Sequence, residues 1–162
     1  MAKEKETQKH TRDVRIVNRR ARRDFEILEV LECGLQLTGT EVKSLRGGNA
    51  KIDEAHARLD KGQLYLVGAT FGQYPQAAPG MQHDTLRDRK LLVHRSQLAK
   101  LESHVRQKGK TLIPLVMYFK RGWAKCEIGV AVGRRRYDKR EAIKKRQQQR
   151  DIARELGRRR RS

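Results

Sequence analysis

Two places in the sequence carry residue types that are common in catalytic or metal sites. His83 and Asp84 are adjacent, but no nucleophile or third polar group lies at a recognisable spacing from them. Cys33 and Cys126 are far apart, and neither has a CxxC or Cys/His partner at metal-ligand spacing. Walker, GxGxxG, HExxH and nucleophile-elbow motifs are also absent. We therefore expect reduced, buried cysteines, no catalytic residues, no metal and no other cofactor.

The chemistry that the composition favours is the binding of anions. The 162 residues include 39 Lys and Arg against 19 Asp and Glu, a formal net charge of +20. Half of this excess lies in residues 133–162, which hold fourteen basic and four acidic side chains. So strong a bias predicts a polyanionic partner.

A compact basic cluster lies near the N-terminus, in Asn18-Arg-Arg-Ala-Arg-Arg-Asp24. Asn18 can cap a single helical turn or bend the chain into the first strand. The arginines favour an anion site, although a run of charge on a solvated surface gives the same pattern.

Residues 37–48 predict a short helix between two strands. Thr38 and Glu41 have the spacing of a capping box, and Gly47-Gly48 supplies the positive-φ exit. Val42 and Leu45 share the face expected to dock on a core. The other face carries two cations that can meet an anion, Lys43 and Arg46.

Most of the remaining chain predicts strands joined by hairpins. We expect one long strand over residues 25–37 with a kink at Gly34, and a hairpin over 55–71. Pro114 inside an apolar run indicates an edge or a bulge. Ser96 is the expected cap of a helix that buries Leu98, Leu101 and Val105. The other segments are a loop at 72–85 and strands at 91–93, 111–119 and 123–132.

The predicted fold class is mainly β, a small antiparallel barrel of oligonucleotide-binding type with about three flanking helices. Residues 1–13 are expected to be a disordered N-terminus, and residues 14–132 the β-barrel domain. Residues 133–162 are expected to be a basic C-terminal tail.

The tail has helix signals but little to hold it on a core. Asp138 and Glu141 have capping-box spacing, Glu141 and Lys145 form an i,i+4 pair, and Gly157 is a natural stop. Apolar residues are few and the charge is unbalanced, so we expect disorder alone and a helix on a polyanion. Tyr137 could stack on a base or be an ordinary exposed tyrosine.

These observations predict a single-domain RNA-binding protein rather than an enzyme. A basic structural or assembly protein of the ribosome remains the alternative. No apolar run approaches the roughly 18 residues of a membrane span, the N-terminus has no signal-peptide core, and the tail lacks a large apolar face. We therefore expect no membrane partner and a soluble, cytoplasmic protein.

Six ordered blocks of the sequence form one recognisable pattern over about residues 16–150. The blocks are Asn18-Arg-Arg-Ala-Arg22, Leu37-Thr-Gly-Thr-Glu-Val-Lys-Ser-Leu-Arg46, Arg87-Asp-Arg-Lys-Leu-Leu92, Thr111-Leu-Ile-Pro-Leu115, Tyr118-Phe-Lys120 with Gly122 and Ala124-Lys125, and Tyr137-Asp-Lys-Arg140. Together these blocks resemble the bacterial SsrA-binding protein family, also called small protein B.

The resemblance implies an RNA-binding adaptor of trans-translation, the rescue of stalled ribosomes. Such a protein, expected to be a monomer, binds the tRNA-like domain of transfer-messenger RNA. It helps deliver that RNA, with elongation factor Tu bound to the RNA, to the ribosome. The tail is then expected to enter the vacant mRNA channel beyond the decoding centre and to fold there as a helix.

The resemblance and the basic pattern together give two sets of candidate site residues. Glu32 is the unexpected member, since it would either accept from a base or ribose or form an ion pair with Arg19 or Arg20. Arg134 and Arg135 replace the lysines usual in the family. The RNA-binding candidates are Asn18, Arg19, Arg20, Arg22, Glu32, Lys43, Arg46, Arg89, Lys90, Leu92 and Lys125, and the ribosome-binding tail candidates are Arg134, Arg135, Arg136, Tyr137, Asp138, Lys139, Arg140, Lys144 and Lys145.

Overall fold

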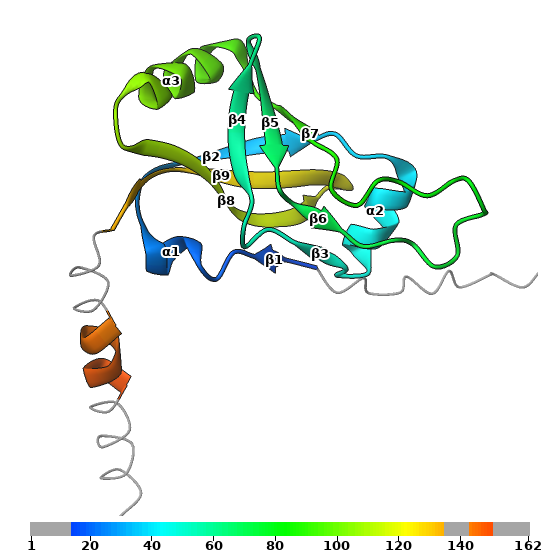
Figure 1. Ribbon diagram of the computed structural model, residues 1–162, viewed down its shortest axis with the longest axis horizontal. Helices are drawn as coiled ribbons and strands as arrows, with labels where there is room; N and C mark the ends of the chain where they lie inside the picture. Colours follow the sequence, from blue (N-terminus) through cyan, green and yellow to red (C-terminus); the bar gives the residue numbers. More distant parts are fainter. Residues whose placement is uncertain (1–13, 135–142, 151–162) are drawn as a thin grey trace, which may run out of the picture.

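Antiparallel strands close into a barrel in the computed structural model, which describes residues 14–134 and 143–150 (Figure 1). The ring runs β8-β4-β5-β7-β2-β9 and closes because β9 pairs with β8 as well as with β2. The strands of the ring are β2 (Phe25–Leu35), β4 (His56–Asp60), β5 (Gln63–Val67), β7 (Arg89–Leu92), β8 (Lys110–Lys120) and β9 (Trp123–Gly133). The predicted small antiparallel barrel is confirmed.

Short elements complete the fold. Strand β1 (Ile16–Val17) pairs with the outer edge of β8, and β3 (Ala50–Lys51) pairs with β6 (Thr70–Phe71) in a separate two-stranded sheet. Three helices flank the barrel at separate places, α1 (Ala21–Asp24), α2 (Gly39–Arg46) and α3 (Arg95–Arg106) (Figure 1). Within the described ranges, no helix combines the length and the apolar composition that a membrane crossing requires.

Two register shifts bend the long strands. One lies in β2 between Ile27 and Glu29, and the other in β8 between Pro114 and Val116. The bulge expected at Pro114 is therefore present, because proline cannot donate to a ladder. The irregularity expected at Gly34 is found earlier in β2 instead.

Gly34 serves a close approach between strands. It pairs with Leu92 of β7 on one side and with Lys125 of β9 on the other. A Cβ at this position would lie 3.1 Å from the Cβ of Leu92. Glycine therefore lets β7 pack directly against the end of β2.

The barrel interior is apolar and includes both cysteines. Cys33 and Cys126 are buried, free and directly opposite each other on β2 and β9. Burial raises the pKa of Cys33 to about 12 and also raises that of Cys126. These thiols are therefore protonated at neutral pH and behave as small core residues.

The cap predicted for α2 is confirmed, whereas the cap predicted for α3 is not. Thr38 and Glu41 form the expected capping box, in which the Thr38 amide donates to Glu41 Oε2 at 2.8 Å. The expected cap at Ser96 is wrong, since α3 starts at Arg95 and His94 is its cap, with its amide donating to Gln97. At the other end of α3, Val105 is 42% exposed instead of buried.

A buried ion-pair network joins α2 to β7. Glu41 is fully buried, and its carboxylate accepts from Arg87 Nε at 2.7 Å and from the equally buried Arg89 Nε at 3.0 Å. Arg89 also donates to the carbonyls of Ala69 and Thr85, at 2.7 and 3.1 Å. One side chain thus ties a strand to the loop that precedes it.

Glu41→Gln should destabilise the fold by about 3–5 kcal/mol, because it leaves Arg89 buried without its counter-charge. Urea unfolding at neutral pH measures this loss. The matched control is Glu54→Gln, which removes an exposed ion pair with Arg20 and should cost less than about 1 kcal/mol. Equal losses in the two variants would contradict the structural role of the network.

The same variant should change the response to acid. Burial alone would raise the pKa of Glu41, but Arg87, the Thr38 amide and Arg89 outweigh it and lower the pKa from 4.5 to about 2. The stabilisation is thus complete above the pKa of the unfolded chain and is lost as the pH falls from 4.5 towards 2. Unfolding of Glu41→Gln should lack this part of the pH dependence.

Candidate RNA interface

A polar face covers the outside of the barrel where β1, β8, β9 and β2 lie side by side. On it, the guanidinium of Arg15 lies 5.5 Å from the centre of the Tyr118 ring. The Tyr118 hydroxyl donates to Glu32, and Lys120 Nζ donates to the same carboxylate at 3.0 Å. Lys125 Nζ lies 3.8 Å from Glu32 Oε1. We call this surface, defined by Arg15, Glu32, Tyr118, Lys120 and Lys125, the outer face.

A large groove opens at one end of the outer face. Its volume is about 860 Å³, and it brings together Glu32, Leu92 and Lys125, three predicted RNA-binding residues from three strands. Trp123 also lines it and is 74% exposed. Such mixed apolar and charged walls can hold a base and its phosphate together.

A smaller, strongly basic groove of about 370 Å³ lies at the other end. Arg19 and Arg22 line it, together with Arg15 and with Arg146 from the helical residues 143–150. Glu127 is the one carboxylate among these described lining residues. Because Arg15 also contacts Tyr118, the two grooves are linked across the outer face.

Glu32 contacts three of the other side chains of the outer face, Tyr118, Lys120 and Lys125. The Tyr118 hydrogen bond is the largest cause that lowers its pKa, and the Lys120 hydrogen bond is the next. Glu32 does form ion pairs, but the predicted partners, Arg19 or Arg20, are wrong. Arg20 pairs with Glu54 at 3.0 Å, and Glu32 pairs with lysines from β8 and β9.

Helix α2 places its two cations over aromatic rings. The Arg46 guanidinium lies 5.2 Å from the ring centre of Phe119, which lines the large groove. Lys43 Nζ lies 5.0 Å from the ring centre of Tyr74 in the loop before β7. Arg46 therefore lies at the groove, whereas Lys43 lies over the loop beside it.

Two predicted RNA-binding residues, Asn18 and Arg89, have their side chains buried in internal contacts, so direct contact of these side chains with RNA stays a prediction. Asn18 is 6% exposed, donates to the carbonyls of Ile52 and Pro114, and accepts from the amide of Ala21 at 2.9 Å. Arg89 is fully buried in the network with Glu41. Both side chains hold the scaffold together.

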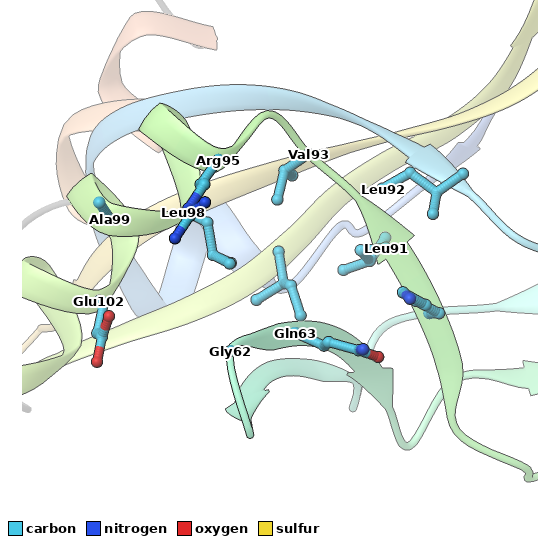
Figure 2. Close-up of a pocket in the computed structure, with 11 residues that line it drawn as sticks. Gly62, Gln63, Leu91, Leu92, Val93, Arg95, Leu98, Ala99 and Glu102 are labelled. Atoms are coloured by element: carbon cyan, nitrogen blue, oxygen red, sulfur yellow. The ribbon is translucent and has the colours of Figure 1, made fainter.

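Lys90 lies on a different groove from Lys125. This groove of about 660 Å³ runs between α3 and strands β5 and β7. Figure 2 shows Leu98 and Leu91 facing it from the helix and from β7, with Arg95 at the start of the helix. Leu92 lines both this groove and the large one, so the two meet along β7.

The basic tail is described only in part. Arg134 donates its amide to the Asp24 carbonyl at 3.0 Å, directly after β9. Lys144 and Lys145 are exposed in the helical segment 143–150, as are its other residues. The predictions for residues 1–13 and for Arg135, Arg136, Tyr137, Asp138, Lys139 and Arg140 concern positions outside the described residues.

Trp123, Tyr118 and Lys120 lie on or beside the outer face but are not among the candidates predicted from the sequence. The signal was present for Trp123, because a tryptophan between Arg121 and Lys125 at a hairpin turn is both exposed and surrounded by positive charge. Tyr118 and Lys120 alternate along β8 and so share one face with each other. Their meeting with Glu32 depends on a pairing of distant strands that spacing along the chain does not reveal.

The residues considered first for catalysis have structural roles. His83 Nδ1 lies 2.9 Å from the hydroxyl of Thr40, and its Nε2 lies 3.1 Å from the Phe71 carbonyl. The ring is 9% exposed and fastens the loop before β7 to α2. In the part of the chain that the structure describes, no three His, Cys, Asp or Glu side chains are grouped as metal ligands.

The closed barrel and its basic outer face define a class, the small β-barrel proteins that bind nucleic acid. A family model described as "SmpB protein" matches residues 15–158, and the chain belongs to that family. The "SsrA-binding protein" of Anaeromyxobacter sp. (strain Fw109-5) is 50% identical over 144 residues, which are 89% of this chain and 87% of that protein. The "SsrA-binding protein" of Trichormus variabilis is 47% identical over 139 residues, or 86% and 90% of the two chains.

A solved structure has the same fold. It is "tmRNA-SmpB: a journey to the center of the bacterial ribosome", with a TM-score of 0.65 and 45% sequence identity. The match covers 80% of this chain and 94% of that chain.

Tyr118→Phe should raise the pKa of Glu32 towards its ordinary value, because it removes the hydrogen bond that lowers it most. An NMR titration of the Glu32 carboxyl carbon measures the change. Tyr65→Phe removes a comparable hydroxyl, which donates to Gln63 on β5, and should leave the Glu32 pKa unaltered. An unaltered Glu32 pKa in Tyr118→Phe would exclude the proposed arrangement of the outer face.

Proposed function

We propose that this protein is an RNA-binding adaptor of trans-translation, which binds the tRNA-like domain of transfer-messenger RNA and delivers it to stalled ribosomes. The observation that carries the proposal is the outer face, on which Glu32, Leu92 and Lys125 share one groove. The names of the relatives, "SsrA-binding protein", and the tmRNA and ribosome of the solved structure support the same partners.

The outer face and the two grooves at its ends supply three kinds of contact with a folded RNA. Arg19, Arg22 and Lys125 provide charge for phosphates. Leu92, half exposed at the rim of the large groove, offers an apolar contact for a ribose or base. Glu32 accepts hydrogen bonds from Tyr118 and Lys120 and forms an ion pair with Lys125, and so holds the two lysines of the face in a fixed array.

The remaining RNA-binding candidates are of two kinds, two that are buried and four basic residues outside the outer face. Asn18 and Arg89 position the face from within the scaffold, and Arg20, Lys43, Arg46 and Lys90 extend the positive charge around it. Elongation factor Tu joins the complex through the RNA, and the protein acts as a cytoplasmic monomer.

The tail is proposed to test whether the mRNA channel is empty. Its basic helix can enter only where no mRNA occupies the space among the rRNA phosphates. Lys144 and Lys145 lie on a helical segment whose side chains are exposed, so they are available to rRNA. Residues 134–140, including Tyr137, are proposed to meet the decoding centre.

Lys125→Gln and Arg22→Gln should each weaken binding of the tRNA-like RNA and lower the slope of log K against log salt by about 0.7–0.9, the value for one phosphate contact. The double variant should lower the slope by about twice that amount. Fluorescence anisotropy at several salt concentrations measures the slopes. Lys100→Gln on the exposed side of α3 is the control with the same charge change. An equally large change of slope in Lys100→Gln would show that RNA binding depends on the net charge of the protein and not on these particular residues.

Deletion of residues 135–162 should leave RNA binding intact and abolish peptide tagging on stalled ribosomes. The cut follows Arg134 because Gly133 pairs with Phe25 and Arg134 bonds Asp24, so both belong to the barrel edge. A gel shift measures RNA binding, and a reconstituted translation system measures tagging.

A full-length variant with the tail lysines and arginines replaced by glutamine separates charge from length. It should also bind RNA without supporting tagging. Persistence of both activities after the deletion would contradict the proposed role of the tail. Loss of tight, specific RNA binding with retained ribosome binding would instead favour the structural ribosomal protein.

A further inference from the structure

The exposure of Trp123 is not explained by the fold. It follows a tight turn in which Arg121 and Gly122 both have positive φ, 51° and 80°. Trp123 is the first residue of β9 after this turn, and its side chain is 74% exposed. Tryptophan carries the largest apolar surface of any residue, so such exposure points to a ligand rather than to packing.

Leu92 provides a second apolar surface on the same groove. It is 50% exposed at the end of β7, and its backbone is fixed by pairing with Gly34. Both Trp123 and Leu92 line the large groove, one from β9 and one from β7. Two exposed apolar side chains on paired strands thus border a single groove.

The charge around this space is complementary to a nucleotide. Lys125 lines the groove, Arg46 lies over its Phe119 wall, and Lys120 and Arg121 lie in the adjoining hairpin. The Glu32 carboxylate is already paired with the two lysines. An aromatic platform beside a positive rim is the arrangement by which proteins hold unpaired bases of RNA.

We propose that the large groove is a nucleobase site, in which one unpaired base of the bound RNA stacks on Trp123 and packs against Leu92. Lys125 then meets the phosphate of the same nucleotide. The inference rests on the proposed function, since it assigns a contact within the RNA complex. It adds a neutral, salt-independent contribution to a face whose other contacts are ionic.

Trp123 is the one tryptophan of the sequence, so the intrinsic fluorescence of the full-length protein reports on this site alone. Saturating it with the tRNA-like domain of transfer-messenger RNA should quench the tryptophan emission and shift its maximum. A blunt-ended RNA duplex, which has no unpaired bases, should at matched charge and salt bind weakly and leave the emission nearly unchanged.

Trp123→Ala should weaken binding of the tRNA-like domain by roughly tenfold to a hundredfold, the range for loss of one stacked base. Trp123→Phe should recover most of the affinity, and Leu92→Ala should lose part of it. In all three variants the slope of log K against log salt should stay at the wild-type value, because no charge changes. Leu86→Ala removes a 60% exposed side chain of the loop before β7 and should have no effect.

Wild-type emission that is unaltered by saturating RNA, or Trp123→Ala affinity within twofold of wild type, would overturn the nucleobase site. These results would leave the proposed function standing as long as the wild-type protein binds the RNA. Failure of the wild-type protein to prefer the tRNA-like domain over the blunt-ended duplex would instead overturn the proposed function.

Discussion

The structure depends on the two-sided pairing of β9. This strand forms backbone hydrogen bonds with β2 along one edge and with β8 along the other. The second pairing closes the ring, so neither β8 nor β9 is left as an open edge of the six-stranded ring. The same pairing brings Glu32, Tyr118 and Lys125 onto one surface, although they come from distant parts of the chain. The strand pairings that close the barrel are therefore the same ones that bring the outer face together.

Buried polar side chains fix the geometry on which that face rests. Asn18 bonds the backbone of two other segments in the gap beside β8, and Glu41 with Arg89 joins α2 to β7. These groups have no capacity left for a ligand, since their donors and acceptors are used within the chain. The exposed cations around them are thus held on a rigid support, which reduces the entropy lost when RNA binds.

Local patterns predicted much of the fold and less of the site. The Thr38 capping box, the Pro114 bulge and the barrel itself follow from spacing and residue type. The bulge in β2, the burial of Asn18 and the pairing of Glu32 with Lys120 depend on which distant strands meet. That choice is set by packing across the whole barrel, so no local pattern contains it.

We propose that RNA binds on the outer face and in the groove beside Trp123. Mapping of amide chemical shifts on titration with the tRNA-like domain tests it most directly. We expect the shift changes to concentrate at Arg15, Glu32, Leu92, Trp123 and Lys125 and to be small at the β4–β5 hairpin. Changes concentrated on that hairpin, with the outer face unaffected, would contradict it.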